Sequence, residues 1–171
     1  MEHNLPNRKR LRLFDFYYGT PGTYFITICT IDRQPLLSRT QYDKATDSAS
    51  VILSQHGKIV DKQLQQMRTF YPTISILHHV IMPNHVHLIL NVTDEETANT
   101  APRQHSAVSR FISTFKRFCN KESGAKLWQR GFHDHIIRDL ADYERHLRYI
   151  EENPIRWQTD ELVCETPQSY Q

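Results

Sequence analysis

The stretch VIMPNHVHLIL, residues 80–90, spans the end of one expected β-strand, a turn and most of a second strand. Residues 73–82 alternate in a manner typical of a strand, and residues 85–92 are rich in β-branched and apolar residues. Pro83 and Asn84 lie between them. Proline is pre-set for the first corner of a turn and asparagine tolerates the second. We therefore expect the two strands to form an antiparallel hairpin.

The hairpin lies within a regular order of strand-like and helix-like segments. The strand-like segments are rich in β-branched and aromatic residues, whereas the helix-like segments repeat apolar residues every three or four positions. The pattern predicts a strand over 22–32, a helix over 48–71 that Pro72 ends, a helix over 107–120, a last strand within 127–139, and a third helix that begins near Asp139 or Asp142 and runs to Glu152 or Asn153. This order predicts an α+β, ferredoxin-like (RRM-like) fold, in which a four-stranded antiparallel sheet carries two helices on one face. The third helix would be an addition that lies over or beside the open face.

His85 and His87 belong to the second strand of the hairpin, which should be one of the two central strands of this sheet. Side chains alternate along a strand, so both imidazoles project from one face about 7 Å apart while Val86 enters the other face. Two imidazoles at that separation can bind one metal ion, or each can be satisfied by hydrogen bonds or by solvent. Burying two polar rings without partners costs free energy, which favours the metal site.

A second histidine pair, His133 and His135, flanks Asp134 on the predicted last strand. Asp134 would have to point into the core, so this pair fits a strand end or a polar rim better, where it could face a substrate. A hydrolytic metal site in which both histidines join His85 and His87 is an alternative. It lacks a convincing carboxylate ligand.

The third helix presents two stripes when its residues are placed at 100° intervals. Tyr143, Leu147 and Ile150 form the apolar stripe that should face the core. A second stripe is polar, and its members are Asp142, His146, Tyr149 and Asn153. A phenol, an amide, an imidazole and a carboxylate on one stripe suit a functional site. For the asparagine the alternative is a cap, because Asn-Pro often begins a following helix.

Basic side chains are unevenly distributed along the chain. The formal net charge is +2, although residues 151–171 are strongly acidic, so the rest of the chain is more basic than the total suggests. The run NRKRLR, residues 7–12, is either a solvated arm or a phosphate-binding segment, since lysine and arginine release condensed counterions from nucleic acid. Expected DNA contacts are Arg8, Lys9, Arg10 and Arg12 in this arm, Arg110, Lys116 and Arg117 on the second helix, and Arg130, His133 and Arg138 around the last strand.

The length of 171 residues fits one domain. We expect this domain over residues 1–157, with a basic arm over 1–12 and an acidic tail over 158–171. The 3 cysteines are odd in number and show no paired spacing, which argues against a disulfide framework. An apolar N-terminal signal region and an 18-residue apolar run are both missing from the sequence, which predicts a cytoplasmic protein that does not enter membranes.

Four motifs in this order resemble those of a known family. PNHVHLI, residues 83–89, resembles the HUH signature (histidine, bulky hydrophobic, histidine) of single-tyrosine transposases and rolling-circle nucleases. It is followed by SRFISTFKRF (109–118), WQRGFHDHIIRD (128–139) and YIEENP (149–154), and the whole arrangement resembles the REP-associated tyrosine transposases, or RAYTs. The resemblance extends over residues 24–157.

This resemblance implies a metal-dependent endonuclease and strand transferase that acts on single-stranded DNA hairpins, the repetitive extragenic palindromes (REPs), at the nucleoid. Tyr149 matches the nucleophile that forms a 5′-phosphotyrosine link. His85 and His87 match the metal-binding pair, and Asn153 matches a third ligand of Mg²⁺ or Mn²⁺, where relatives outside this branch have glutamine. The family branch also implies a monomer. His146, one turn before the tyrosine, and His135 are expected to assist.

The alternative to an enzyme is a non-catalytic regulator that binds hairpin DNA or RNA on the same fold. Such a protein needs neither a metal-binding histidine pair nor a nucleophile. The presence of His85, His87, Tyr149 and Asn153 together therefore favours the enzyme.

Overall fold

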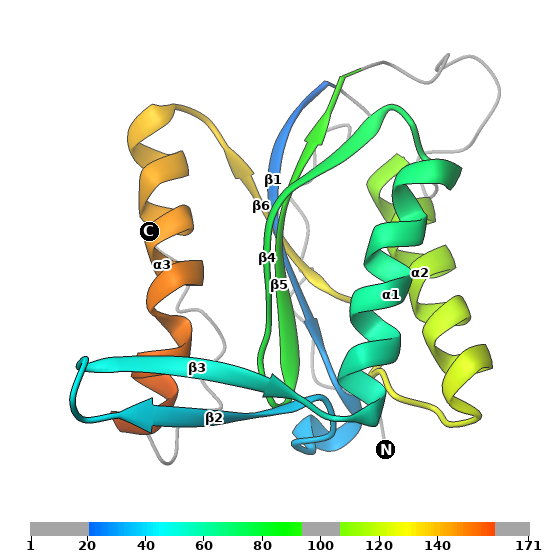
Figure 1. The fold of residues 1–171 in the computed structure, drawn as a ribbon. Helices are drawn as coiled ribbons and strands as arrows, with labels where there is room; N and C mark the ends of the chain where they lie inside the picture. The colour runs from blue at the N-terminus through cyan, green and yellow to red at the C-terminus, as the bar shows by residue number, and fades with distance from the viewer. Residues whose placement is uncertain (1–20, 94–106, 160–171) are drawn as a thin grey trace, which may run out of the picture.

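The computed structural model describes residues 21–93 and 107–159, so the basic arm and nearly all of the acidic tail lie outside the described residues. Its centre is an antiparallel sheet with the strand order β4-β5-β1-β6 (Figure 1). The strands are β1 (Gly22–Cys29), β4 (Ile74–Ile81), β5 (His85–Val92) and β6 (His133–Ile137). The predicted hairpin is therefore present as β4 and β5, and β1 and β5 are the two central strands as expected.

Helices cover both faces of this sheet, as Figure 1 shows. The helices α1 (Gln55–Phe70) and α2 (Ala107–Ser123) lie against one face, and α3 (Leu140–Thr159) lies against the other. The predicted α+β, ferredoxin-like fold with an added C-terminal helix is thus confirmed. None of the helices in the described part of the chain is long and apolar enough to cross a membrane.

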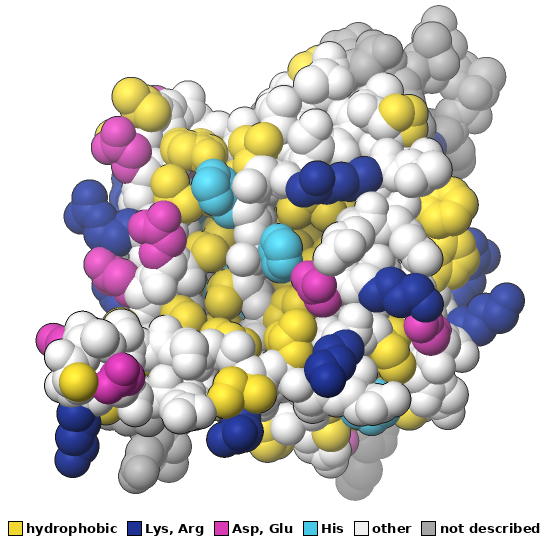
Figure 2. Space-filling model, in the orientation of Figure 1, with side chains coloured by type: hydrophobic (Ala, Val, Ile, Leu, Met, Phe, Trp, Pro, Cys, Tyr) yellow, Lys and Arg dark blue, Asp and Glu magenta, His cyan; other side chains and the backbone are white. Residues whose placement is uncertain are grey.

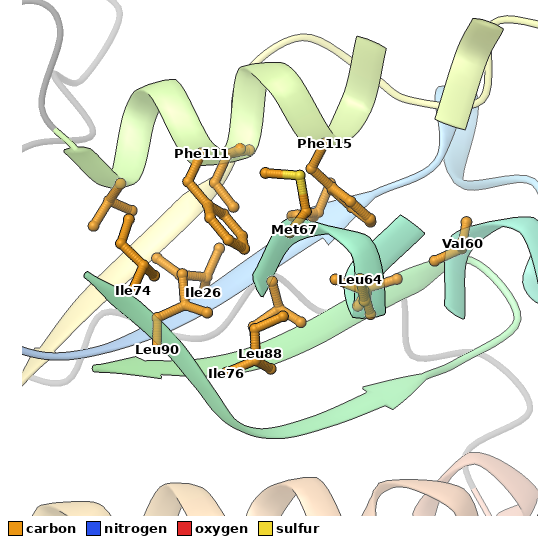
Figure 3. Close-up of a cluster of buried hydrophobic side chains, with 14 of the residues drawn as sticks. Ile26, Val60, Leu64, Met67, Ile74, Ile76, Leu88, Leu90, Phe111 and Phe115 are labelled. Atoms are coloured by element: carbon orange, nitrogen blue, oxygen red, sulfur yellow. The ribbon is translucent and has the colours of Figure 1, made fainter. Parts of the chain in front are cut away.

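The alternation of side chains along β1 and β5 divides the interior into two clusters. Val86, Leu88 and Leu90 of β5 point toward α1 and α2 and are fully buried. Figure 3 shows Ile26, Leu88 and Leu90 of the sheet packed with Leu64 and Met67 of α1 and with Phe111 and Phe115 of α2. The opposite face carries a smaller cluster in which Phe25 and Ile89 meet Ile150 of α3. Val86 is therefore anchored in the main core while its two histidine neighbours face α3.

A hairpin that the sequence patterns did not predict lies between β1 and α1. It consists of β2 (Ser38–Asp43) and β3 (Ser48–Leu53), which pair in antiparallel register. The expected start of the helix at residue 48 is therefore wrong. The six residues SASVIL alternate between exposed and half-buried positions, as a strand does. The helix begins only after Ser54, whose hydroxyl caps it by accepting a hydrogen bond from the Gly57 amide at 3.1 Å.

Gly57 allows the first turn of α1 to lie directly against the chain leading into β2. A Cβ at this position would stand 2.0 Å from the carbonyl oxygen of Leu37 and 3.3 Å from Cβ of Leu53. We expect Gly57→Ala to lower the free energy of unfolding by about 1–3 kcal/mol, because the backbone must move to relieve the overlap. Urea unfolding measures this effect. The exposed helix substitution Gln66→Ala is the control, and equal stability of the two variants would contradict the packing described here.

The third helix begins where expected but ends later. The Asp139 carboxylate accepts a hydrogen bond from the Asp142 amide at 2.8 Å and therefore caps the helix. The expected end at Glu152 or Asn153 is wrong, because α3 continues through Pro154 to Thr159. Proline removes one helical hydrogen bond, but Asn153 and Pro154 are both buried. The C-terminal half of α3 lies alongside the β2–β3 hairpin, and packing there favours continuation of the helix (Figure 1).

Candidate active site

His85 and His87 project from one face of β5 toward α3, as the strand periodicity predicts. Their ring centroids are 4.4 Å apart. His87 is 2% exposed, and the sheet places it opposite Thr27 of β1. The two imidazoles therefore form a close pair in a mostly enclosed position.

The δ nitrogen of each imidazole has a partner, whereas each ε nitrogen has none. Nδ1 of His87 lies 2.9 Å from the Thr27 hydroxyl oxygen, and Nδ1 of His85 lies 2.7 Å from the amide oxygen of Asn84. An amide oxygen only accepts hydrogen bonds, so Nδ1 of His85 carries the proton and Nε2 holds a lone pair. Nε2 of both rings is buried and makes no hydrogen bond. Buried polar atoms rarely lack partners. A histidine that binds a metal through one ring nitrogen usually hydrogen-bonds to an oxygen through the other, as both rings do here.

Burial keeps both histidines neutral. It lowers the pKa of His85 to about 4, and the polar side chain of Asn153 nearby offsets part of this effect. Burial also lowers the pKa of His87 well below its ordinary value, and repulsion from a protonated His85 or His146 would lower it further. Neutral imidazole is the form that binds a metal ion. Both rings are therefore in the ligand-competent state at neutral pH.

These pKa values predict acid sensitivity of the metal-free protein. Unfolded histidine titrates near 6.5, whereas folded His85 titrates at about 4, so the unfolded state binds more protons between these values. Stability is thus fully present above about pH 6.5 and declines as the pH falls toward 4, with His85 alone contributing about 1–2 kcal/mol between pH 7 and pH 5. Urea unfolding in a chelator measures this loss. His85→Gln should flatten the pH profile relative to the exposed control His79→Gln, and identical profiles would contradict the assignment.

Tyr149 and Asn153 reach the histidine pair from α3. The Tyr149 ring centroid lies 5.2 Å from that of His87, with the rings edge to face. Asn153 is 6% exposed and lies near His85. The structure thus brings together the four residues that the sequence motifs single out, two from β5 and two from α3. Their chemical roles remain predictions.

Other residues at this site escaped the sequence patterns. Phe25 stacks on His87 at a centroid distance of 5.0 Å and meets Tyr149 at 6.1 Å. Trp157 lies 6.0 Å from His85 and is present there only because α3 continues beyond Pro154. Thr27 is identified only by the register of β1 against β5. None of these residues has a spacing that marks it in the sequence.

Arg33 adds positive charge near the histidines. Burial is the main cause of the lowered pKa of His133, and the charge of Arg33 lowers that pKa further. The same charge also lowers the pKa of His85. Arg33 and its neighbour Asp32 both have positive φ, 52° and 49°. Such backbone conformations are strained in residues other than glycine and occur often at functional sites. Arg33 therefore adds a positive charge close to His85 and His133, on a backbone conformation that is rare outside glycine.

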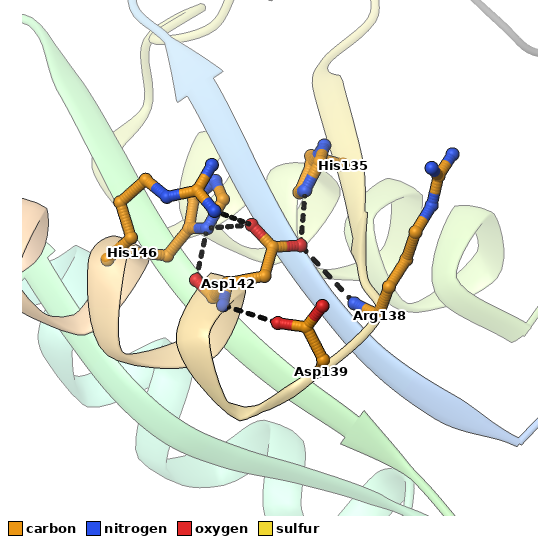
Figure 4. Close-up of polar contacts among 6 residues, drawn as sticks. His135, Arg138, Asp139, Asp142 and His146 are labelled. Atoms are coloured by element: carbon orange, nitrogen blue, oxygen red, sulfur yellow. Dashed lines mark hydrogen bonds and ion pairs between the residues drawn. The ribbon is translucent and has the colours of Figure 1, made fainter.

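A second polar cluster joins β6 to the start of α3 (Figure 4). Nε2 of His135 lies 2.8 Å from one Asp142 carboxylate oxygen. Nδ1 of His146 lies 3.2 Å from the other carboxylate oxygen, and it donates its hydrogen bond to the Asp142 carbonyl oxygen at 2.8 Å. The His135 and His146 rings are stacked with centroids 4.6 Å apart. Burial acts to raise the pKa of Asp142, but the hydrogen bonds from His135 and from the Arg138 amide outweigh it and lower that pKa. The two residues expected to assist thus contact this carboxylate.

The predicted DNA-contacting residues of α2 do not lie beside the histidine pair. Arg110, Lys116 and Arg117 belong to the helix that covers the opposite face of the sheet (Figure 1). The Lys116 amine donates hydrogen bonds to the carbonyl oxygen of Gln129 at 3.0 Å and to that of Gly131, and burial lowers its pKa to about 8. This lysine therefore holds the loop that leads into β6. Its contact with DNA stays a prediction.

The remaining predicted contacts are distributed around β6. His133 pairs with Thr27 in register and lies on the α3 side of the sheet, while Arg130 and Arg138 are exposed at the two ends of the strand. On the face shown in Figure 2, the lysine and arginine side chains of the described residues stand apart, with acidic side chains among them. This face offers no continuous basic track in the described part of the chain. The four basic residues of the arm lie outside the described residues.

The sequence is similar to those of several known proteins. No protein-family model matches the chain. A Haemophilus influenzae protein assigned as a REP-associated tyrosine transposase is 31% identical over 166 residues, which cover 91% of this chain and 81% of the relative. The Escherichia coli REP-associated tyrosine transposase is 27% identical over 140 residues, covering 82% of this chain and 70% of the relative. An uncharacterized H. influenzae protein is 29% identical over 176 residues, covering 93% and 94%.

A solved structure shares the fold. It is that of a REP-associated tyrosine transposase bound to a REP hairpin, and it matches with a TM-score of 0.61 and 23% identity over 85% of this chain and 73% of that one. The fold similarity agrees with the sequence relationship, which extends over nearly the whole described chain. The chain belongs to the REP-associated tyrosine transposases.

Proposed function

We propose that this transposase cuts single-stranded DNA beside a hairpin and rejoins it through a covalent link to Tyr149. The observation that carries the proposal is the juxtaposition of the Tyr149 ring, 5.2 Å from His87, with two buried and unpartnered imidazole nitrogens. Membership of the family supports the reaction class. The REP hairpin in the related structure supports a palindromic element as the substrate.

The residues around the histidine pair fit a divalent metal ion. Nε2 of His85 and of His87 would hold it, and the amide oxygen of Asn153 would be the third ligand. These ligands are uncharged, so they leave the positive charge of Mg²⁺ or Mn²⁺ available to phosphate oxygens. When bound, such an ion acts as a Lewis acid and as a template for in-line attack on phosphorus.

Tyr149 is the proposed nucleophile. Its phenol oxygen attacks phosphorus, so that a P–O bond to tyrosine forms while the bond from phosphorus to the 3′ oxygen breaks. The phenol gives its proton to water, and the 3′ oxygen takes up a proton from water to become a free 3′-hydroxyl. The product is a 5′-phosphotyrosine, which a 3′-hydroxyl can attack in turn, because a phenol is a good enough leaving group to permit strand transfer.

The proposed site is complete within one chain, which supports action as a monomer. Tyr149 and His87 meet in the same fold. If two chains shared their active sites, a mixture of Tyr149→Phe and His87→Ala proteins would regain activity by forming mixed sites. We expect no recovery in this mixture, as measured by cleavage of a labelled hairpin. Recovery would show that the helix of one chain serves the histidines of another.

A labelled single-stranded hairpin tests the function directly. The protein is incubated with it in Mn²⁺, in Mg²⁺ or in chelator, and the products are separated under denaturing conditions. We expect an adduct that survives denaturation and requires metal, whereas an unstructured strand of the same composition should react poorly. A shifted but uncut hairpin would identify a non-catalytic binder, and the absence of an adduct with either metal would contradict the proposed chemistry.

A further inference from the structure

Three potential metal ligands converge where β6 meets the first turns of α3, away from the histidine pair. One ring nitrogen each from His135 and His146 and one carboxylate oxygen of Asp142 all lie within 4.8 Å of one another. Figure 4 shows both imidazoles directed at the same carboxylate, one from the strand and one from the helix. No other group of three such ligands at this spacing occurs among the described residues.

We propose that His135, Asp142 and His146 form a second metal site, which binds one Zn²⁺ or a similar transition-metal ion. Two imidazoles and one carboxylate are a ligand set that suits zinc, with a water molecule completing the tetrahedron. The His85, His87 and Asn153 set lacks a carboxylate. The two sites therefore differ in their ligand chemistry.

The spacing of the ligand atoms is close to what a zinc ion requires. Bonds of 2.0–2.2 Å in a tetrahedron place ligand atoms about 3.4 Å apart. Here Nε2 of His135 lies 2.8 Å from one carboxylate oxygen of Asp142 and Nδ1 of His146 lies 3.2 Å from the other. In the metal-free state a proton bridges His135 and one carboxylate oxygen. The Nδ1 proton of His146 is donated to the Asp142 carbonyl oxygen at 2.8 Å, so the other carboxylate oxygen is buried without a hydrogen bond. An ion bound to Nε2 of His135 and Nδ1 of His146 takes the place of both protons, so binding releases them and breaks the hydrogen bond from His146 to the helix carbonyl.

The surroundings of Asp142 hold its carboxylate in place for metal binding. The side chain is 8% exposed, and its carboxylate also accepts a hydrogen bond from the Arg138 amide at 3.2 Å, which fixes its orientation. The His135 side chain is 46% exposed, so an ion can enter from solvent. Arg145 approaches the carboxylate at 3.7 Å, but its side chain is 64% exposed and can move aside.

An ion here would fasten α3 to the sheet. His135 belongs to β6, while Asp142 and His146 belong to the helix that carries Tyr149. The ring of Phe25 contacts His146 at 4.6 Å and His87 at 5.0 Å, so it links the second site to the proposed active site through direct packing. The second ion therefore has a bracing role that holds the helix and its tyrosine over the histidine pair.

Zinc binding to a variant without the first site tests this inference. The double variant His85→Ala/His87→Ala lacks the proposed catalytic ligands, so its titration with Zn²⁺ by calorimetry is independent of any DNA cleavage. We expect one Zn²⁺ per chain and an increase in the thermal unfolding midpoint. Adding His135→Ala, at an exposed position, should weaken zinc binding at least about 100-fold and remove the thermal shift. Loss of a residue that only hydrogen-bonds to a metal ligand lowers metal affinity by about 10–100-fold, and loss of a ligand itself lowers it more.

Two further variants sharpen the result. Asp142→Asn keeps the shape of the side chain but weakens ligation, so it should also lose tight zinc binding while circular dichroism confirms the fold. His79→Ala, at an exposed histidine near Asp61, is the matched control and should leave zinc binding unchanged. The inference is overturned if the double variant binds no zinc, or if His135→Ala leaves the affinity as it was.

Discussion

Tyr149→Phe is expected to abolish the covalent adduct between protein and DNA, with a loss of at least about 10⁴-fold in its rate of formation. The substitution removes the proposed attacking oxygen and nothing else. The phenyl ring can keep its edge-to-face packing on His87 and its contact with Phe25. Hairpin binding and the free energy of unfolding should therefore remain close to those of the wild type. Quantified adduct bands over time measure the rate, and a gel shift measures the binding.

Tyr143→Phe is the matched control for this experiment. Tyr143 lies on the same helix, and its hydroxyl bonds to Nε2 of His78 at 2.9 Å, on the edge strand of the sheet. Removing this hydroxyl should lower stability by about 1 kcal/mol and leave adduct formation intact. An adduct that forms at the wild-type rate in Tyr149→Phe would exclude Tyr149 as the nucleophile.

His87→Ala is expected to reduce metal-dependent cleavage on the order of 10³-fold, because a bound ion supplies several kcal/mol of charge stabilisation. The substitution removes one of the two buried ε nitrogens that have no other partner. Binding of Mn²⁺ at this site should weaken in parallel, which electron paramagnetic resonance can follow in the absence of DNA.

The control is again His79→Ala, because His79 is an exposed histidine on the neighbouring strand β4. It should change neither cleavage nor Mn²⁺ binding. If His87→Ala cleaves the hairpin as well as the control does, the histidine pair has no part in the chemistry. If it binds Mn²⁺ unchanged, the ion is held elsewhere.

The parts of the fold that local pattern determines were predictable from the sequence. The strand alternation around Pro83 and Asn84 identified the β4–β5 hairpin and placed both histidines on the face opposite Val86. Helical spacing separated the apolar stripe of α3 from the polar one. Tyr143, Leu147 and Ile150 do pack against the sheet. These features depend only on side-chain periodicity, which the sequence contains directly.

The features that depend on tertiary packing were not predictable. The β2–β3 hairpin has two strands of six residues each, and it packs against α3. The helix continues through Pro154 because burial there offsets the missing hydrogen bond. The partners that fix the histidine tautomers, Thr27 above all, are adjacent only through strand register. Such contacts join residues far apart in the chain, and no local spacing records them.

Mapping the covalent adduct to a single residue tests the central claim most directly. The protein is allowed to react with a labelled hairpin in Mn²⁺, digested with protease and analysed by mass spectrometry. We predict that the DNA remnant is attached to the phenol oxygen of Tyr149 through a 5′-phosphate. Attachment to another tyrosine, to a serine or to a histidine would contradict the proposed active site.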